Sequence, residues 1–220
     1  MNSFTKLLFI CVIIFTFLPC NPCSASENDV QYWNIFSVTR KINSAWKINL
    51  SDEQKIGENI SEPFFHRIDL GVAYKVNNVV SLEAHYKHMH LKVANEWKRV
   101  RVPYFNLLVN LQNSYLTLQS RNRMEYMGYT YKAHHWRFRE RIKILSGKPF
   151  TSLKIKPFGA EEFFYDFNKS KFRENRLYLG VNLPLFSHLR ADFYYALQHI
   201  KNPDWYFNHI GGTIFSYTLN

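Results

Sequence analysis

Apolar and polar residues alternate along most of this chain. From Arg67 to Val76 every second side chain is apolar, and the residues between are mostly charged or small. Asn77 and Asn78 follow, a pair that tolerates the positive φ angles of a tight turn, and the alternation then resumes at Val80. A period of two places the two kinds of side chain on opposite faces of a strand. The segment therefore predicts a β-hairpin with one apolar face and one charged face.

The same pattern recurs to the end of the sequence, over 104–111, 116–126, 136–144, 176–183, 189–198 and 213–219. No long segment after the first residues shows a helical period. The stretches run to about 10 to 13 residues, whereas globular strands average about 5 to 6 and a tilted membrane strand needs about 9 to 11. We therefore expect an all-β fold, an antiparallel transmembrane β-barrel of about 10 to 12 strands.

The connections between these stretches follow a second pattern. Short links near Asn43, Asn77, Asn113, Gly147 and Pro184 alternate with longer segments, which predicts short turns at one rim and long loops at the other. We count 11 strands from residue 30 to residue 219, although closed bacterial barrels normally have an even number. Either one assignment is wrong, or the N-terminal segment pairs irregularly.

Aromatic residues cluster near the expected strand ends. Such clusters predict the two girdles that barrels place at the bilayer interfaces, and core packing in a soluble sandwich is the alternative. The clusters are Tyr32-Trp33, Phe64-Phe65, Phe163-Phe164-Tyr165, Tyr194-Tyr195 and Trp205-Tyr206-Phe207.

Residues 1–25 have the three parts of a secretory signal peptide. A positive charge at Lys6 precedes an apolar run from Leu7 to Leu18, and a small-residue region ends at Ala25. The run is shorter than the roughly 20 residues that a membrane span needs. We expect cleavage after Ala25 and export across the inner membrane, leaving residues 26–220 as a single barrel domain in the bacterial outer membrane. All three cysteines of the sequence lie in the leader, so thiol catalysis and cysteine-based zinc binding are excluded for the mature chain.

Several short motifs follow one another through the mature chain: Tyr32-Trp33, Trp46, Arg121-x-Arg123-x-Glu125, Arg137-x-Arg139-x-Arg141, Pro157-x-x-x-Glu161-Glu162-Phe163-Phe164 and Asn175-Arg176-Leu177-x-Leu179-Gly180. In this order they resemble domain-of-unknown-function family 2490, small predicted outer-membrane barrels of bacteria. The resemblance implies a signal peptide and a barrel, and it implies no catalytic residues.

The polar rows are rich in arginine, and the expected barrel encloses them. Charge buried without partners costs several kcal/mol, so such an interior must be ion-paired or wet. Two interpretations stay open: a self-satisfied polar core that fills a narrow barrel, or a small pore that prefers anions. The candidate lumen-lining residues are Arg67, Asp69, Lys75, Glu83, Lys87, Arg121, Arg123, Glu125, Arg137, Arg139, Arg141, Glu161 (or its neighbour Glu162), Arg176, Arg190 and Asp192.

The chain is strongly basic, with a formal net charge of +11. Nucleic-acid binding is the generic inference from such a charge, but an exported barrel first meets phosphorylated lipid head groups. We therefore expect outer-membrane lipid with anionic head groups as a partner, the barrel-assembly machinery during biogenesis, and no nucleic acid. The basic residues that suit the lipid lie in two expected outside loops, and ordinary solvated charge is the alternative: Lys92, Lys98, Arg99, Arg101, Lys169, Lys171 and Arg173.

Neither a catalytic group nor a cofactor or metal site is predicted. His85, His88 and His90 have metal-like spacing, but on a strand His85 points away from the other two. Ser187-His188 falls in a short turn, and Glu161-Glu162 has no identified His or Ser partner in sequence. Two other functions remain as alternatives: an outer-membrane enzyme acting on lipid or envelope substrates, and a soluble periplasmic barrel that binds an apolar ligand with its charged face outside.

Overall fold

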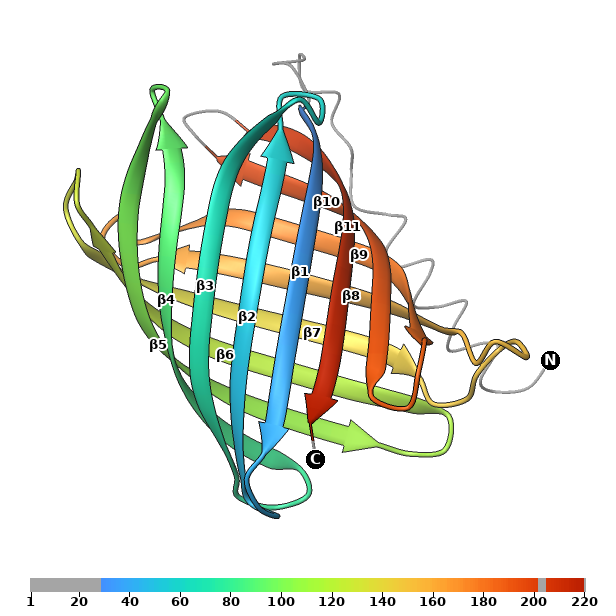
Figure 1. Ribbon diagram of the computed structural model, residues 1–220. Helices are drawn as coiled ribbons and strands as arrows, with labels where there is room; N and C mark the ends of the chain where they lie inside the picture. Colours follow the sequence, from blue (N-terminus) through green and yellow to red (C-terminus); the bar gives the residue numbers. More distant parts are fainter. Residues whose placement is uncertain (1–28, 202–204, 220) are drawn as a thin grey trace.

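Eleven long β-strands form one closed barrel in the computed structural model, which describes residues 29–201 and 205–219 (Figure 1). The strands contain between 11 and 17 residues. None of the described residues belongs to a helix long and apolar enough to cross a membrane. The strands are β1 (Asp29–Lys41), β2 (Trp46–Gly57), β3 (Glu62–Lys75), β4 (Val80–Val93), β5 (Glu96–Gln112), β6 (Leu116–Tyr129), β7 (His135–Ser146), β8 (Lys156–Asp166), β9 (Lys171–Pro184), β10 (Leu189–Lys201) and β11 (Trp205–Leu219).

The barrel closes through one parallel pair. Strands β1 to β11 each pair antiparallel with their neighbours in sequence, whereas β1 pairs parallel with β11, from Asp29 opposite Asn208 to Arg40 opposite Leu219. An odd number of strands joined by hairpins leaves the first and last running in the same direction, and Figure 1 shows both arrows pointing the same way. The count of 11 is therefore confirmed for the described residues, and the N-terminal strand is the one that pairs irregularly.

The predicted alternation of short turns and long loops is wrong. We call the end of the barrel with the β1–β2 and β3–β4 turns the lower rim, and the opposite end the upper rim (Figure 1). Upper-rim connections are short because the strands extend into the expected loops: residues 58–61 join β2 to β3, and residues 94–95 join β4 to β5. The longest connection among the described residues, 147–155, lies at the lower rim. Backbone ladders continue where the apolar pattern stops, since they do not require apolar side chains.

Three lower-rim turns are closed by the side chain of an asparagine. The side-chain Oδ1 atoms of Asn43, Asn77 and Asn113 accept hydrogen bonds of 2.8 to 2.9 Å from the backbone N–H groups two and three residues later. These Asx turns replace a backbone turn and reverse the chain within three or four residues. The asparagines therefore stabilise these hairpins, but the predicted positive φ angles at Asn77 and Asn78 are wrong: neither residue has one, because the link has four residues, 76–79, and closes by the Asx turn.

The two faces of the wall differ as the alternation predicts. Leu70 and Phe105 on the outward face are 55% and 65% exposed, whereas Lys87 and Glu125 on the inward face are 1% and 0% exposed. An apolar surface of this extent fits acyl chains rather than water. The arrangement expected for a soluble barrel, with its charged rows outside, is therefore wrong.

Aromatic side chains gather near both rims of the outer surface. Trp46 and Tyr74 lie near the lower rim with ring centroids 4.8 Å apart, and Trp97, Trp136 and Trp205 lie near the upper rim, all of them exposed. The predicted clusters split between the two faces, because adjacent residues on a strand point opposite ways. One member of most pairs therefore turns inward and is buried: Trp33, Phe65, Phe164 and Tyr194.

Candidate functional site

The interior of the barrel holds a cavity of about 400 Å³, lined by residues of every strand except β5. Most of its charged groups are cations. Three carboxylates line it, those of Glu53, Glu162 and Asp192, against ten Lys and Arg side chains: Lys55, Arg67, Lys87, Arg121, Arg123, Arg137, Arg139, Arg141, Lys143 and Arg176.

Glu125 of β6 neutralises the most cations in the lumen. Its Oε1 accepts from Lys87 Nζ at 2.5 Å and from Arg139 at 3.1 Å, and its Oε2 accepts from Arg137 at 2.5 and 2.8 Å. Arg123 lies 3.4 Å from Oε1. The carboxylate is completely buried and does not line the cavity. Its charge is therefore enclosed behind the cations it binds.

Glu162 of β8 forms a second centre. It accepts from Arg121 at 2.5 Å, from Arg139 at 2.9 Å and from the hydroxyl of Tyr178 at 3.2 Å, while Arg176 lies 3.9 Å away. Arg139 contacts both Glu125 and Glu162, so the two centres share one guanidinium. Together they form a continuous network across β4, β6, β7, β8 and β9.

Smaller ion-paired groups occupy the rest of the inner wall. Glu53 binds Arg67 at 2.7 Å and lies 3.6 Å from Lys55. Asp69 accepts from the Tyr104 hydroxyl at 2.5 Å. On the opposite side Lys143 and Asp192 pair at 2.8 Å, and Glu174 pairs with Arg176. The polar face is therefore extensively paired, as an enclosed charged surface must be.

Four arginines on β6 and β7 lie directly opposite one another. The register sets Arg121 against Arg141 and Arg123 against Arg139, an arrangement of like charges that is unfavourable unless other groups compensate. Among the described residues no carboxylate lies within ion-pair distance of Arg141, and Arg121 Nε has no hydrogen-bond partner. Positive charge and donor capacity are thus left over at this point of the cavity wall.

Two apolar clusters also reach the interior. One joins Phe65, Met89, Val100, Val102 and Tyr129 with their neighbours on β3 to β6. The other surrounds Trp33 and includes inward residues of β8, β10 and β11. Both narrow the space between the charged rows. The alternation did not predict them, because at these positions the inward residue is itself apolar.

The predicted lumen residues are placed as follows. The inward rows of their strands include Arg67, Asp69, Glu83, Lys87, Arg121, Arg123, Glu125, Arg137, Arg139, Arg141, Arg176 and Asp192. Lys75 and Arg190 belong to the same rows but lie at the lower rim, where both are exposed. Glu161 is a correction: it points outward and accepts a hydrogen bond from Asn175, while Glu162 points inward. The phase of β8 follows Phe158, Ala160 and Phe164, which are buried.

Sequence reasoning missed several charged lumen residues, among them Glu53, Lys55, Lys143 and Glu174. Extending the phase of Trp46, Ile48 and Leu50 along β2 finds the first two. The same reasoning finds Glu174, because it lies two residues before Arg176 on β9 and so belongs to the same inward row; the pairing of β8 with β9 shifts register only beyond it.

The histidines divide between the two faces. His85 points inward, where its Nδ1 lies 2.7 Å from Asp69, whereas His88 and His90 lie on the outward row. The described part of the chain holds no group of three or more His, Cys, Asp or Glu side chains arranged to bind a metal ion.

The upper mouth adds further positive charge. Lys132, in the β6–β7 connection, places its ammonium 4.0 Å from the ring centroid of Tyr129. Burial, together with the nearby charges of Arg173 and Lys169, holds the pKa of Lys132 below its ordinary value. Asp166 offsets part of this charge, 3.8 Å from Arg173.

A closed barrel with an apolar exterior and a charged interior is a membrane-spanning β-barrel. A solved structure titled "NanC porin structure in rhombohedral crystal form" has the same fold, with a TM-score of 0.50 and 11% sequence identity over 82% of this chain and 91% of that chain. Comparison with curated proteins gave no match. The chain belongs to the family described as "Protein of unknown function (DUF2490)", whose model matches residues 30–207. The resemblance seen in the sequence is thereby confirmed.

Proposed function

We propose that this protein is a bacterial outer-membrane barrel that forms a narrow pore preferring anions. The observation that carries the proposal is the cavity wall, where ten cationic side chains face three carboxylates. Glu125, the carboxylate with the most cationic partners, is withdrawn from the cavity surface, so a solute inside meets ammonium and guanidinium groups first.

Selection follows from charge in a poorly hydrated space. At an effective dielectric constant of about 20, two unit charges about 4 Å apart interact by roughly 4 kcal/mol, well above thermal energy. Arg121 and Arg141 project from adjacent positions of β6 and β7, and no carboxylate of the described residues lies within ion-pair distance of Arg141, although Glu162 pairs with it across the strands. An anion gains these donors as it loses water, whereas a cation is repelled.

The density of ion pairs favours a second candidate, a filled barrel with a purely structural role. Glu125 and Glu162 hold cations from β4, β6, β7 and β9 together across the interior. The two apolar clusters further reduce the open cross-section.

Planar-bilayer recording separates the two functions. We expect the purified protein in a KCl gradient to give small conductance steps and a reversal potential that shows chloride preferred over potassium. The double variant Arg121→Gln with Arg141→Gln lowers that preference severalfold. Arg40→Gln, on the outer surface near the lower rim, leaves it unchanged. Absence of conductance supports the filled barrel, and a preference for potassium refutes the proposed selection.

The location of the barrel follows from the same features. An exported chain with an apolar outer wall inserts in the outer membrane through the barrel-assembly machinery. The leader at residues 1–25 lies outside the described residues and supplies the export step of this proposal. Fractionation tests it: the protein stays with outer membranes in high salt and needs detergent for release, and its gel migration shifts only after heating. Release by salt alone contradicts the proposal.

A further inference from the structure

A group of basic side chains lies on the outer wall of the barrel, outside the lumen. We call it the His/Arg patch: His66 on β3, His88 and His90 on β4, and Arg99 and Arg101 on β5. Cross-strand pairing sets His90 between His66 and Arg99, and it sets His88 beside Arg101. All five residues alternate with inward residues such as Lys87 and Val100, so they point away from the lumen.

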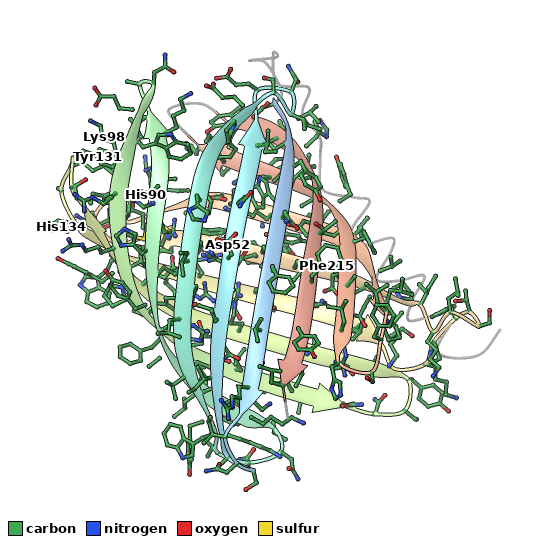
Figure 2. All side chains as sticks on the ribbon, in the orientation of Figure 1. Asp52, His90, Lys98, Tyr131, His134 and Phe215 are labelled. Atoms are coloured by element: carbon green, nitrogen blue, oxygen red, sulfur yellow. The ribbon has the colours of Figure 1, made fainter. Side chains whose placement is uncertain are left out.

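The histidines contact one another, whereas the arginines are free of acidic partners. The rings of His66 and His90 are stacked with centroids 6.5 Å apart, and those of His88 and His90 lie 4.9 Å apart. Asp52 on β2 is the acidic neighbour, 2.6 Å from His66 Nε2; Figure 2 labels both Asp52 and His90. No carboxylate in the described part of the chain lies within ion-pair distance of Arg99 or Arg101, and both arginines are exposed. One acid therefore faces two arginines and three histidines.

The patch sits where the apolar wall ends. Directly below it on the same three strands, Ile68, Tyr86 and Phe105 are 50%, 45% and 65% exposed. Above it Trp97 and Lys98 mark the upper rim, and Figure 2 labels Lys98 there. Arginine facing acyl chains costs about 2 to 4 kcal/mol at mid-bilayer but only about 0 to 1 near the interface. The patch therefore lies at the level of the lipid head groups.

We propose that the His/Arg patch binds the phosphate groups of phosphorylated lipids in the leaflet around the upper rim. Arg99 and Arg101 present planar donors that match phosphate oxygens. Because neighbouring strands are about 4.8 Å apart, one phosphate reaches an arginine of β5 and the histidine opposite it on β4. The apolar residues below provide the surface for the acyl chains of the same lipid. The sequence predicted Arg99 and Arg101 in an outside loop, whereas the structure places both on the outer wall, in β5. From there their side chains reach the lipid. This inference is independent of the pore.

Binding of a defined lipid tests the proposal. The folded protein in neutral detergent micelles is titrated with bisphosphorylated lipid A and, separately, with the same lipid after removal of its phosphates, and native mass spectrometry measures the bound fraction. We expect the phosphorylated form to bind tightly and the dephosphorylated form weakly. Arg99→Gln combined with Arg101→Gln weakens binding by about thirtyfold, about fivefold for each charge. The matched control, Arg40→Gln with Lys148→Gln, removes two cations near the lower rim and leaves affinity unchanged.

Three results overturn the inference. Equal binding of the dephosphorylated lipid shows that apolar contacts alone hold it. An equal loss in the lower-rim control shows that only net charge matters. Displacement of the lipid by inorganic phosphate at a similar concentration shows a free-anion site rather than a lipid site. Each variant is first shown to migrate as a folded barrel without heating, and the single substitutions Arg99→Gln and Arg101→Gln, with about fivefold loss each, serve if the double variant does not fold.

Discussion

Replacing Glu125 with Gln removes the carboxylate charge that Lys87, Arg123, Arg137 and Arg139 share, while keeping the shape of the side chain. The site is fully buried, so water does not replace the lost charge. Removing one partner of a buried ionic group costs about 3 to 5 kcal/mol, because the remaining charges stay buried and unpaired. For a chain of this size each kcal/mol shifts the unfolding midpoint by about 2 to 4 °C. We therefore expect a fall of about 6 to 20 °C.

Gel migration after incubation at increasing temperatures measures this midpoint, because a closed barrel migrates as a folded band until it is heated enough to unfold. The control is Glu161→Gln, the same chemical change on the outer wall, where the carboxylate has one hydrogen bond from Asn175. We expect its midpoint to move by no more than about 2 °C, in line with surface substitutions. Equal midpoints for Glu125→Gln and wild type refute the assignment of Glu125 as the centre of the network. So does an equal loss in Glu161→Gln.

Two further predictions concern packing and closure of the wall. Gly180→Ala destabilises the barrel by about 1 to 3 kcal/mol, because its added Cβ would lie 2.5 Å from a backbone carbonyl oxygen of β10. Gly211→Ala is tolerated, because no atom lies within 4 Å of its added Cβ. Equal unfolding midpoints of the two variants contradict this packing. Asn34→Cys with Thr213→Cys forms a disulfide on mild oxidation, since these positions face each other across the parallel β1–β11 pair. Asn34→Cys with Tyr217→Cys, about 13 Å further along β11, stays reduced, and the reverse result disproves the parallel register.

The alternation predicted the strands and the direction of each face, because it depends only on neighbouring residues. Ile68 and Leu70 point outward and Arg67 and Asp69 point inward, as the period of two requires. The same rule placed Glu161 wrongly and did not distinguish it from Glu162, because two carboxylates in succession give no phase of their own. Nor does the alternation show where β2 ends, because Asp52 and Gln54 interrupt the apolar row while the backbone ladder continues to Gly57.

What the sequence alone determined is the class of fold: long amphipathic strands, asparagine turns and a basic polar face are local properties of neighbouring residues. Tertiary structure decided the rest. The parallel closure of β1 on β11, the sharing of Arg139 by Glu125 and Glu162, and the meeting of His66, His90 and Arg99 all join residues far apart in the chain. Such contacts depend on cross-strand register, and register is set by the whole closed sheet rather than by any one strand.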